Sequence, residues 1–151
     1  DWFNVNATKV FGKWQNLVSC ASWSHWDIFE ARRPANQLVE GDTGYWAFHS
    51  CNFKDGKSVS DLRANDTEWN KFLDGIGHNG GVWRWWAGGG SDTQNSSDYY
   101  INISFSTMKE YGEYRDARMN AMMSGSMPEQ IADCAAPRVY SANNIKAITT
   151  N

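Results

Sequence analysis

Two segments of this chain repeat one another, and the repeat limits the folds that the chain can adopt. The opening residues DWFNVN are echoed by DYYINI from Asp98, and KVFGKW from Lys9 is echoed by KEYGEY from Lys109. Each copy is followed by a cysteine and an alanine, at Cys20 and at Cys134. A partial duplication of this kind predicts one whole structural unit preceded by part of another, which cannot bury its own apolar face alone.

After residue 44 the expected elements run strand, helix, strand, strand, helix, strand. Aromatic and β-branched runs bounded by glycine and aspartate predict strands over 45–53, 81–86, 99–105 and 138–140. Ser58 with Asp61 and Thr107 with Glu110 are capping-box pairs, so helices are expected from 58 to 73 and from 107 to Gly125. The two faces of strand 99–105 should differ: Tyr99, Ile101 and Ile103 toward the helices, Tyr100, Asn102 and Ser104 away from them.

This order is the split βαβ, or ferredoxin-like, pattern. It predicts an α+β fold in which a βαββαβ unit forms a four-stranded antiparallel sheet with both helices on one face. Residues 1–44 fit the strand–helix–strand end of the same unit, with a strand at 2–7, a helix at 8–18 and a strand at 22–30. We therefore expect a partial repeat over 1–44, packed on the main unit or on a partner, and a ferredoxin-like domain over 45–151.

The element order, the aromatic strands and the helix 58–73 with Trp69 resemble the dimeric α/β-barrel superfamily, similar to antibiotic-biosynthesis-monooxygenase-like domains. The resemblance is one of fold pattern and covers about residues 45–146. It implies two sheets packed face to face, from a homodimer or from tandem repeats, with a pocket in the barrel or between sheet and helices. Heme-degrading members combine a strand Asn with a helix Trp and His. Asn52 and Trp69 match the first two, but neither expected helix contains a histidine.

Composition excludes several classes of protein. The 17 acidic residues outnumber the 14 basic ones, so no basic face is expected for nucleic acid. No apolar run approaches the roughly 20 residues of a transmembrane helix. Nine tryptophans in a hydrophilic chain suggest an extracellular protein, and a start at Asp1 suggests a mature or trimmed product. Four glycosylation sequons occur, at Asn6, Asn65, Asn95 and Asn102.

The cysteines suggest a disulfide. In the expected sheet the end of strand 45–53 lies beside the start of the last strand, which brings Cys51 close to Cys134. Closing so long a loop would stabilise the fold by roughly 4–5 kcal/mol in the chain-entropy model. Cys20 is left without a partner. A disulfide favours an oxidising compartment, so the protein is expected to be secreted or periplasmic.

The candidate catalytic residue is His49, which lies mid-strand on the same face as Cys51. A strand histidine facing a barrel interior can act as a general base, although it can equally be a hydrogen-bonded polar residue of a half-buried sheet. His25, with Asp27 on the same strand face, is a weaker candidate, and His78 is expected to be exposed in a glycine-rich turn. No HxH, HExxH or CxxC motif occurs, so neither a metal site nor a cofactor is expected.

The expected function is binding of a small organic molecule in the barrel, with cofactor-free proton transfer or oxygenation by His49 as an option. Strand alternation places Tyr100 and Asn102 at the barrel interior, joined by Arg138 and either by His49 and Cys51 or by Phe48 and Ser50. Trp83 and Trp85 share one strand face and form either a ligand surface or buried cover. Two alternatives remain: a homo-oligomeric assembly subunit whose aromatic faces contact protein, and a secreted carbohydrate-binding module.

Overall fold

A computed structural model describes residues 26–35, 39–88 and 97–144, and its centre is one antiparallel sheet of six strands. The strand β1 (Trp26–Arg32) lies at one edge and pairs with β3 (Val82–Ala87), which pairs with β4 (Tyr99–Phe105). β4 then pairs with β2 (Thr43–Phe53). The short strands β5 (Ala132–Cys134) and β6 (Arg138–Asn143) both lie along the far side of β2.

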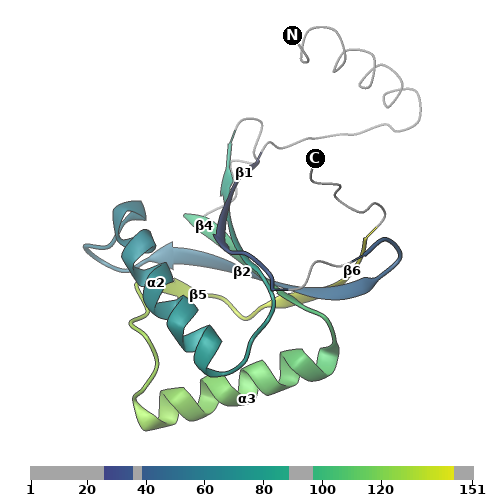
Figure 1. Ribbon diagram of the computed structural model, residues 1–151. Helices are drawn as coiled ribbons and strands as arrows, with labels where there is room; N and C mark the ends of the chain where they lie inside the picture. Colours follow the sequence, from purple (N-terminus) through teal and green to yellow (C-terminus); the bar gives the residue numbers. More distant parts are fainter. Residues whose placement is uncertain (1–25, 36–38, 89–96, 145–151) are drawn as a thin grey trace, which may run out of the picture.

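Two helices cover one face of this sheet (Figure 1). The helix α2 (Val59–Gly75) follows β2, and the Asp61 carboxylate accepts a hydrogen bond from the Ser58 backbone N–H at 2.8 Å. The helix α3 (Met108–Ser124) follows β4, and Thr107 Oγ1 accepts from the Glu110 N–H. It ends at Gly125, whose φ of 71° is left-handed and favours glycine. Both helix starts were therefore readable from local capping chemistry.

The expected fold class is wrong. In place of a four-stranded ferredoxin-like βαββαβ unit preceded by a separate partial copy, one sheet of six strands contains β1 as an edge strand. β1 joins because β3 would otherwise present unpaired backbone groups along that edge. At the opposite edge, Pro137 has no N–H to donate, and the last arm of the chain is divided there into β5 and β6. The strand and helix expected within residues 2–18 lie outside the described residues.

Strand alternation gives the sheet two unlike faces. The helix-covered face carries Tyr99, Ile101 and Ile103 of β4, and the register places Ile101 opposite His49. The other face carries Tyr100 and Asn102, opposite Ser50 and Phe48. We call this second face the aromatic face, because its described residues include the rings of Trp26, Trp46, Phe48, Trp83, Trp85, Tyr100 and Tyr140.

The apolar interior between sheet and helices consists of two clusters. One gathers Leu73 of α2 and Tyr114 of α3 with the strand residues Val82, Ile103 and Phe105. The other gathers Leu62 and Tyr99 with Cys51, Ile131 and Ala132. Cys51 of this second cluster lies opposite Cys134 across β2 and β5, and the two form the expected disulfide, which links residues 83 positions apart. The bond holds the short edge strand β5 against β2.

Candidate functional site

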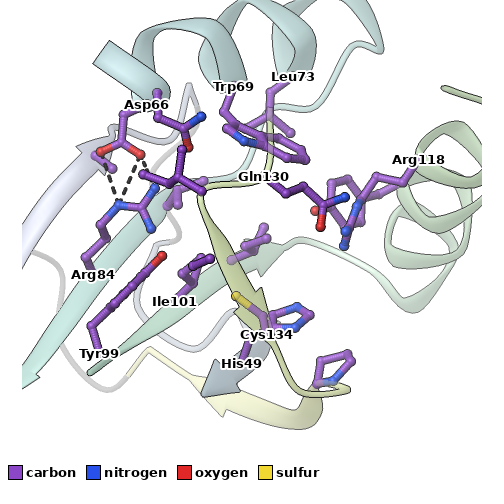
Figure 2. A pocket seen from close by; sticks show the side chains of 18 of the residues that line it. His49, Asp66, Trp69, Leu73, Arg84, Tyr99, Ile101, Arg118, Gln130 and Cys134 are labelled. Carbon is purple, nitrogen blue, oxygen red and sulfur yellow. Dashed lines mark hydrogen bonds and ion pairs between the residues drawn. The ribbon is translucent and has the colours of Figure 1, made fainter. Parts of the chain in front are cut away.

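A cavity of about 370 Å³ lies between the sheet and the two helices, with residues of both apolar clusters in its walls (Figure 2). Trp69 and Leu73 line it from α2, and Tyr111 and Tyr114 line it from α3. The floor is formed by Ile101, Ile103 and their strand neighbours, and one side by the segment from Gln130 to Pro137. Aromatic and aliphatic side chains share this surface with polar and charged ones, a mixture that suits a small-molecule site.

One end of the cavity contains a buried ion pair between α2 and β3. Arg84 and Asp66 are only 4% and 7% exposed, and Arg84 Nε donates to both carboxylate oxygens at 3.0 and 3.1 Å. Arg84 Nη2 also contacts the carboxylate, and the guanidinium carbon lies 5.4 Å from the Tyr99 ring centroid. Arg84 Nη1 is buried without a hydrogen-bond partner in the described part of the chain. A buried donor of this kind is costly unless something bound accepts from it.

The cavity has an excess of positive charge. Arg84, Arg115 and Arg118 line it, whereas Asp66 is its one acidic lining residue among those described. Arg118 lies 5.8 Å from the ring centroids of both Trp69 and Tyr114, and its Nε is buried without a partner. Within residues 26–35, 39–88 and 97–144, no carboxylate forms a salt bridge with Arg115 or Arg118. The site is therefore suited to an anion.

His49 lines the same cavity and stands beside Cys134, with Trp69 and Leu73 on the opposite wall (Figure 2). Its Nδ1 lies 3.0 Å from the carbonyl oxygen of Ala135. Burial lowers the pKa of His49, and the nearby charge of Arg118 lowers it further, against the raising effect of the Ala135 carbonyl. The imidazole is therefore neutral near pH 7 and can accept a hydrogen bond or a proton.

The other expected ligand-binding residues lie together, but not with His49. Trp83, Trp85, Tyr100, Asn102 and Arg138 all occupy the aromatic face, as the register shows. Phe48 and Ser50, rather than His49 and Cys51, share that face with them. A pocket joining His49 to the other five does not form, because adjacent residues of a strand point to opposite sides of the sheet.

Asn102 is the unusual residue of the aromatic face. It is fully buried, opposite Phe48 on one side and Trp83 on the other. Neither its amide nitrogen nor its amide oxygen has a hydrogen-bond partner among the described residues. Its surroundings explain the burial: a stacked pair of Trp46 and Trp83, 6.0 Å apart, lies on this face next to the Phe48–Trp85 contact at 5.6 Å.

Two cavity residues, Asp66 and Arg118, were not among the expected ligand-binding residues, and the charges of α3 including Arg118 were expected on a solvated face, although the spacing of both residues carries a detectable signal. Asp66 follows Leu62 by four residues and precedes Trp69 and Leu73 by three and seven, so it lies on the apolar stripe of its helix. Arg118 has the same relation to Tyr111, Tyr114 and Ala121 in α3. A lone charge on the buried side of an amphipathic helix requires a partner or a ligand. The positions of Asp66 and Arg118 on the apolar stripes of their helices therefore indicated that both could be site residues.

The remaining candidates are settled by burial and hydrogen bonding. His78, expected to be exposed, is only 4% exposed and packs against Phe105 and Tyr114 at centroid distances of 5.1 and 5.6 Å. Of the sequons, Asn65 donates its amide to the Glu129 carbonyl at 2.8 Å, and Asn102 is buried. His25, Cys20 and the sequons at Asn6 and Asn95 lie outside the described residues.

Comparisons with models of protein families, with curated proteins and with solved structures found no match to this chain. The resemblance to the dimeric α/β-barrel superfamily therefore has only the sequence pattern behind it. None of the helices in the described part is long and apolar enough to cross a bilayer. The described residues contain no group of three His, Cys, Asp or Glu side chains positioned to hold a metal ion.

Proposed function

We propose that the protein binds a small organic anion with an aromatic or aliphatic body in the cavity between sheet and helices. The observation that carries this proposal is a pair of buried arginine nitrogens, on Arg84 and Arg118, that have no hydrogen-bond partner among the described residues and belong to side chains lining a cavity with aromatic and aliphatic walls. An acidic group would accept from such donors, and charge-assisted hydrogen bonds are about twice as strong as neutral ones. The rings of Trp69 and Tyr114 supply flat surfaces for the body of the ligand.

The size of the cavity supports a ligand of one or two rings. A volume of about 370 Å³ is near the lower end of the 300–1,000 Å³ range of small-molecule sites. Arg118, the better exposed of the two arginines, has no carboxylate partner among the described residues, whereas Arg84 is held by Asp66. Arg118 is therefore the expected contact of the acidic group. Asp66 fixes Arg84 in place at one end of the cavity.

The test compares a charged probe with its neutral counterpart. Isothermal titration calorimetry would measure the Kd of 2-naphthoate and of 2-naphthamide, which share a shape but differ in charge. Arg118→Met keeps the aliphatic stem and removes the charge, and should weaken naphthoate binding roughly 10- to 100-fold, as expected for loss of a charge-assisted hydrogen bond. Ile101→Trp, which fills the floor of the cavity, should abolish binding of both probes.

Arg63→Met is the matched control, because Arg63 is exposed on α2 and does not line the cavity. It should leave both Kd values unchanged. Equal affinity for the acid and the amide, or naphthoate binding that ignores both Arg118→Met and Ile101→Trp, would overturn the proposal. Circular dichroism of each variant would establish that it is folded.

A second candidate function is that of an assembly subunit which associates with itself through the aromatic face. The observation that favours it is the number of aromatic side chains on the side of the sheet away from the helices, with Tyr140 at 49% exposure. Aromatic residues are enriched in protein interfaces. Sedimentation velocity of the wild type and of Tyr140→Ser would test it, since a monomer over the micromolar range would exclude self-association.

The compartment is also a proposal. A disulfide joins Cys51 to Cys134, and disulfides persist mainly where the environment is oxidising. We infer that the protein acts in the periplasm or outside the cell. Alkylation of the protein in freshly lysed cells, followed by mass spectrometry, would find these two cysteines unlabelled if the inference is correct.

A further inference from the structure

Several polar side chains in the cavity wall are committed to other groups of the protein, which limits what a ligand can bond to. The Asp66 carboxylate is held by Arg84. The amides of Asn65 and Asn70 donate to the carbonyls of Glu129 and Ala31, and the Trp69 indole also donates to Glu129. These amide and indole nitrogens are therefore occupied, whereas the unpartnered nitrogens of Arg84 and Arg118 can still donate to a ligand.

His49 differs from these residues, because its hydrogen bond fixes which ring nitrogen carries the proton. A carbonyl oxygen can only accept, so the contact of 3.0 Å to Ala135 requires Nδ1 to be the protonated nitrogen. In the neutral ring, Nε2 then holds a lone pair. Among the described residues no donor reaches Nε2, so this nitrogen is an unused acceptor on a side chain that lines the cavity.

The position of His49 relative to the arginines defines a two-point site. His49 projects from β2, whereas Arg118 projects from α3, so the acceptor and the cation stand on different walls (Figure 2). An anion whose acidic group contacts Arg118 can direct a second polar group to His49 only if that group donates. The fixed tautomer of His49 therefore selects ligands whose second polar group is a hydrogen-bond donor. The arginines do not make this selection, because they only donate.

We propose that the ligand carries a hydroxyl or N–H donor in addition to its acidic group, and that His49 Nε2 accepts from this donor. The ligand class is that of hydroxyaryl or aminoaryl carboxylates and their aliphatic analogues. This inference rests on the proposed function of the cavity. It assigns to His49 the role of a specificity-determining residue.

The experiment extends the naphthoate titration. Kd is measured for 2-naphthoate, for its 5-, 6- and 7-hydroxy derivatives and for the corresponding methoxy compounds, which keep the oxygen but cannot donate. At least one hydroxy isomer should bind three- to tenfold more tightly than 2-naphthoate, the gain expected of one neutral hydrogen bond. Its methoxy counterpart should show no such gain.

Two variants of His49 locate the effect. His49→Phe keeps a flat ring without an acceptor, so it should abolish the advantage of the hydroxy isomer, measured as the ratio of its Kd to that of 2-naphthoate in the same variant. His49→Gln can donate to Ala135 and still accept from the ligand, so it should restore part of the advantage. If His49→Phe does not fold, the hydroxy–methoxy comparison in the wild type still tests the need for a donor.

The outcomes separate the two proposals. If 2-naphthoate responds to Arg118→Met but no hydroxy isomer exceeds it, the cavity binds anions and the inference about His49 fails alone. An advantage that persists in His49→Phe also overturns the inference, since the donor then has another acceptor. If neither 2-naphthoate nor its derivatives respond to Arg118→Met, the proposed function itself fails.

Discussion

The two faces of the sheet differ in how their buried polar groups are accommodated. On the helix-covered face, a buried carboxylate and a buried guanidinium neutralise each other at Asp66 and Arg84, and two further arginines surround a cavity. On the aromatic face, a fully buried amide at Asn102 has no partner among the described residues and is enclosed by rings. The unpartnered arginine nitrogens belong to side chains that line a cavity, where a ligand can accept from them, whereas the Asn102 amide is enclosed by rings and weakens the fold.

The largest expected effect comes from removing the acidic half of the buried ion pair. Asp66→Leu leaves the Arg84 charge buried and unpaired, which should lower the free energy of unfolding by about 3–5 kcal/mol in urea titrations. Asp116→Leu on the exposed side of α3 is the control and should change it by less than about 0.5 kcal/mol. Equal effects of the two variants would mean that the ion pair contributes nothing particular.

Removal of the disulfide should cause the second largest loss of unfolding free energy. The double variant Cys51→Ala/Cys134→Ala removes a bond that closes a loop of 83 residues, and should cost about 2–4 kcal/mol of unfolding free energy. Reduction of the wild type with dithiothreitol should produce the same loss. Full stability in both cases would show that β5 is held by its packing in the apolar cluster rather than by the bond.

On the aromatic face we expect a substitution to increase the free energy of unfolding rather than lower it. Asn102→Leu replaces an unpartnered amide by an apolar side chain of similar volume, and should raise the free energy of unfolding by about 1–2 kcal/mol. Asn120→Leu, exposed on α3, is the control. A large loss of stability in Asn102→Leu would show that the amide has a partner in solution, and would remove the contrast between the two faces.

The smallest effect is a pH dependence confined to the helix-covered face. Burial lowers the pKa of both His49 and His78 below 6.5, so the unfolded chain takes up protons first as the pH falls. Stability is therefore complete above the unfolded pKa and declines as the pH drops below about 6.5, by at most about 1.4 kcal/mol per pH unit for each histidine. Urea unfolding between pH 5 and 8 should show a shallower slope in His49→Gln and in His78→Gln. A double variant with the wild-type slope would contradict this assignment.

Local structure was accessible from the sequence because it depends on near neighbours. The strand expected over 99–105 is found at Tyr99–Phe105, and both helices start where the capping pairs of Ser58 and Thr107 predicted. The three-residue strand β5 was not predicted, because a run of three carries no periodicity. The error in fold class came from β1. Its sequence predicts a strand but does not indicate that this strand pairs with β3.

The sequence by itself determined both described helices, the longer strands and their alternation, and it led to the expected pairing of Cys51 with Cys134. These follow from spacing along the chain and from which strand ends must meet. The tertiary structure alone decided that Arg84 of β3 meets Asp66 of α2, that His49 faces the helices while Asn102 faces away, and that a cavity remains between the layers. Such features depend on how whole elements pack against one another. The hydrophobic periodicity of a strand or a helix does not specify the distance between the sheet and the helices.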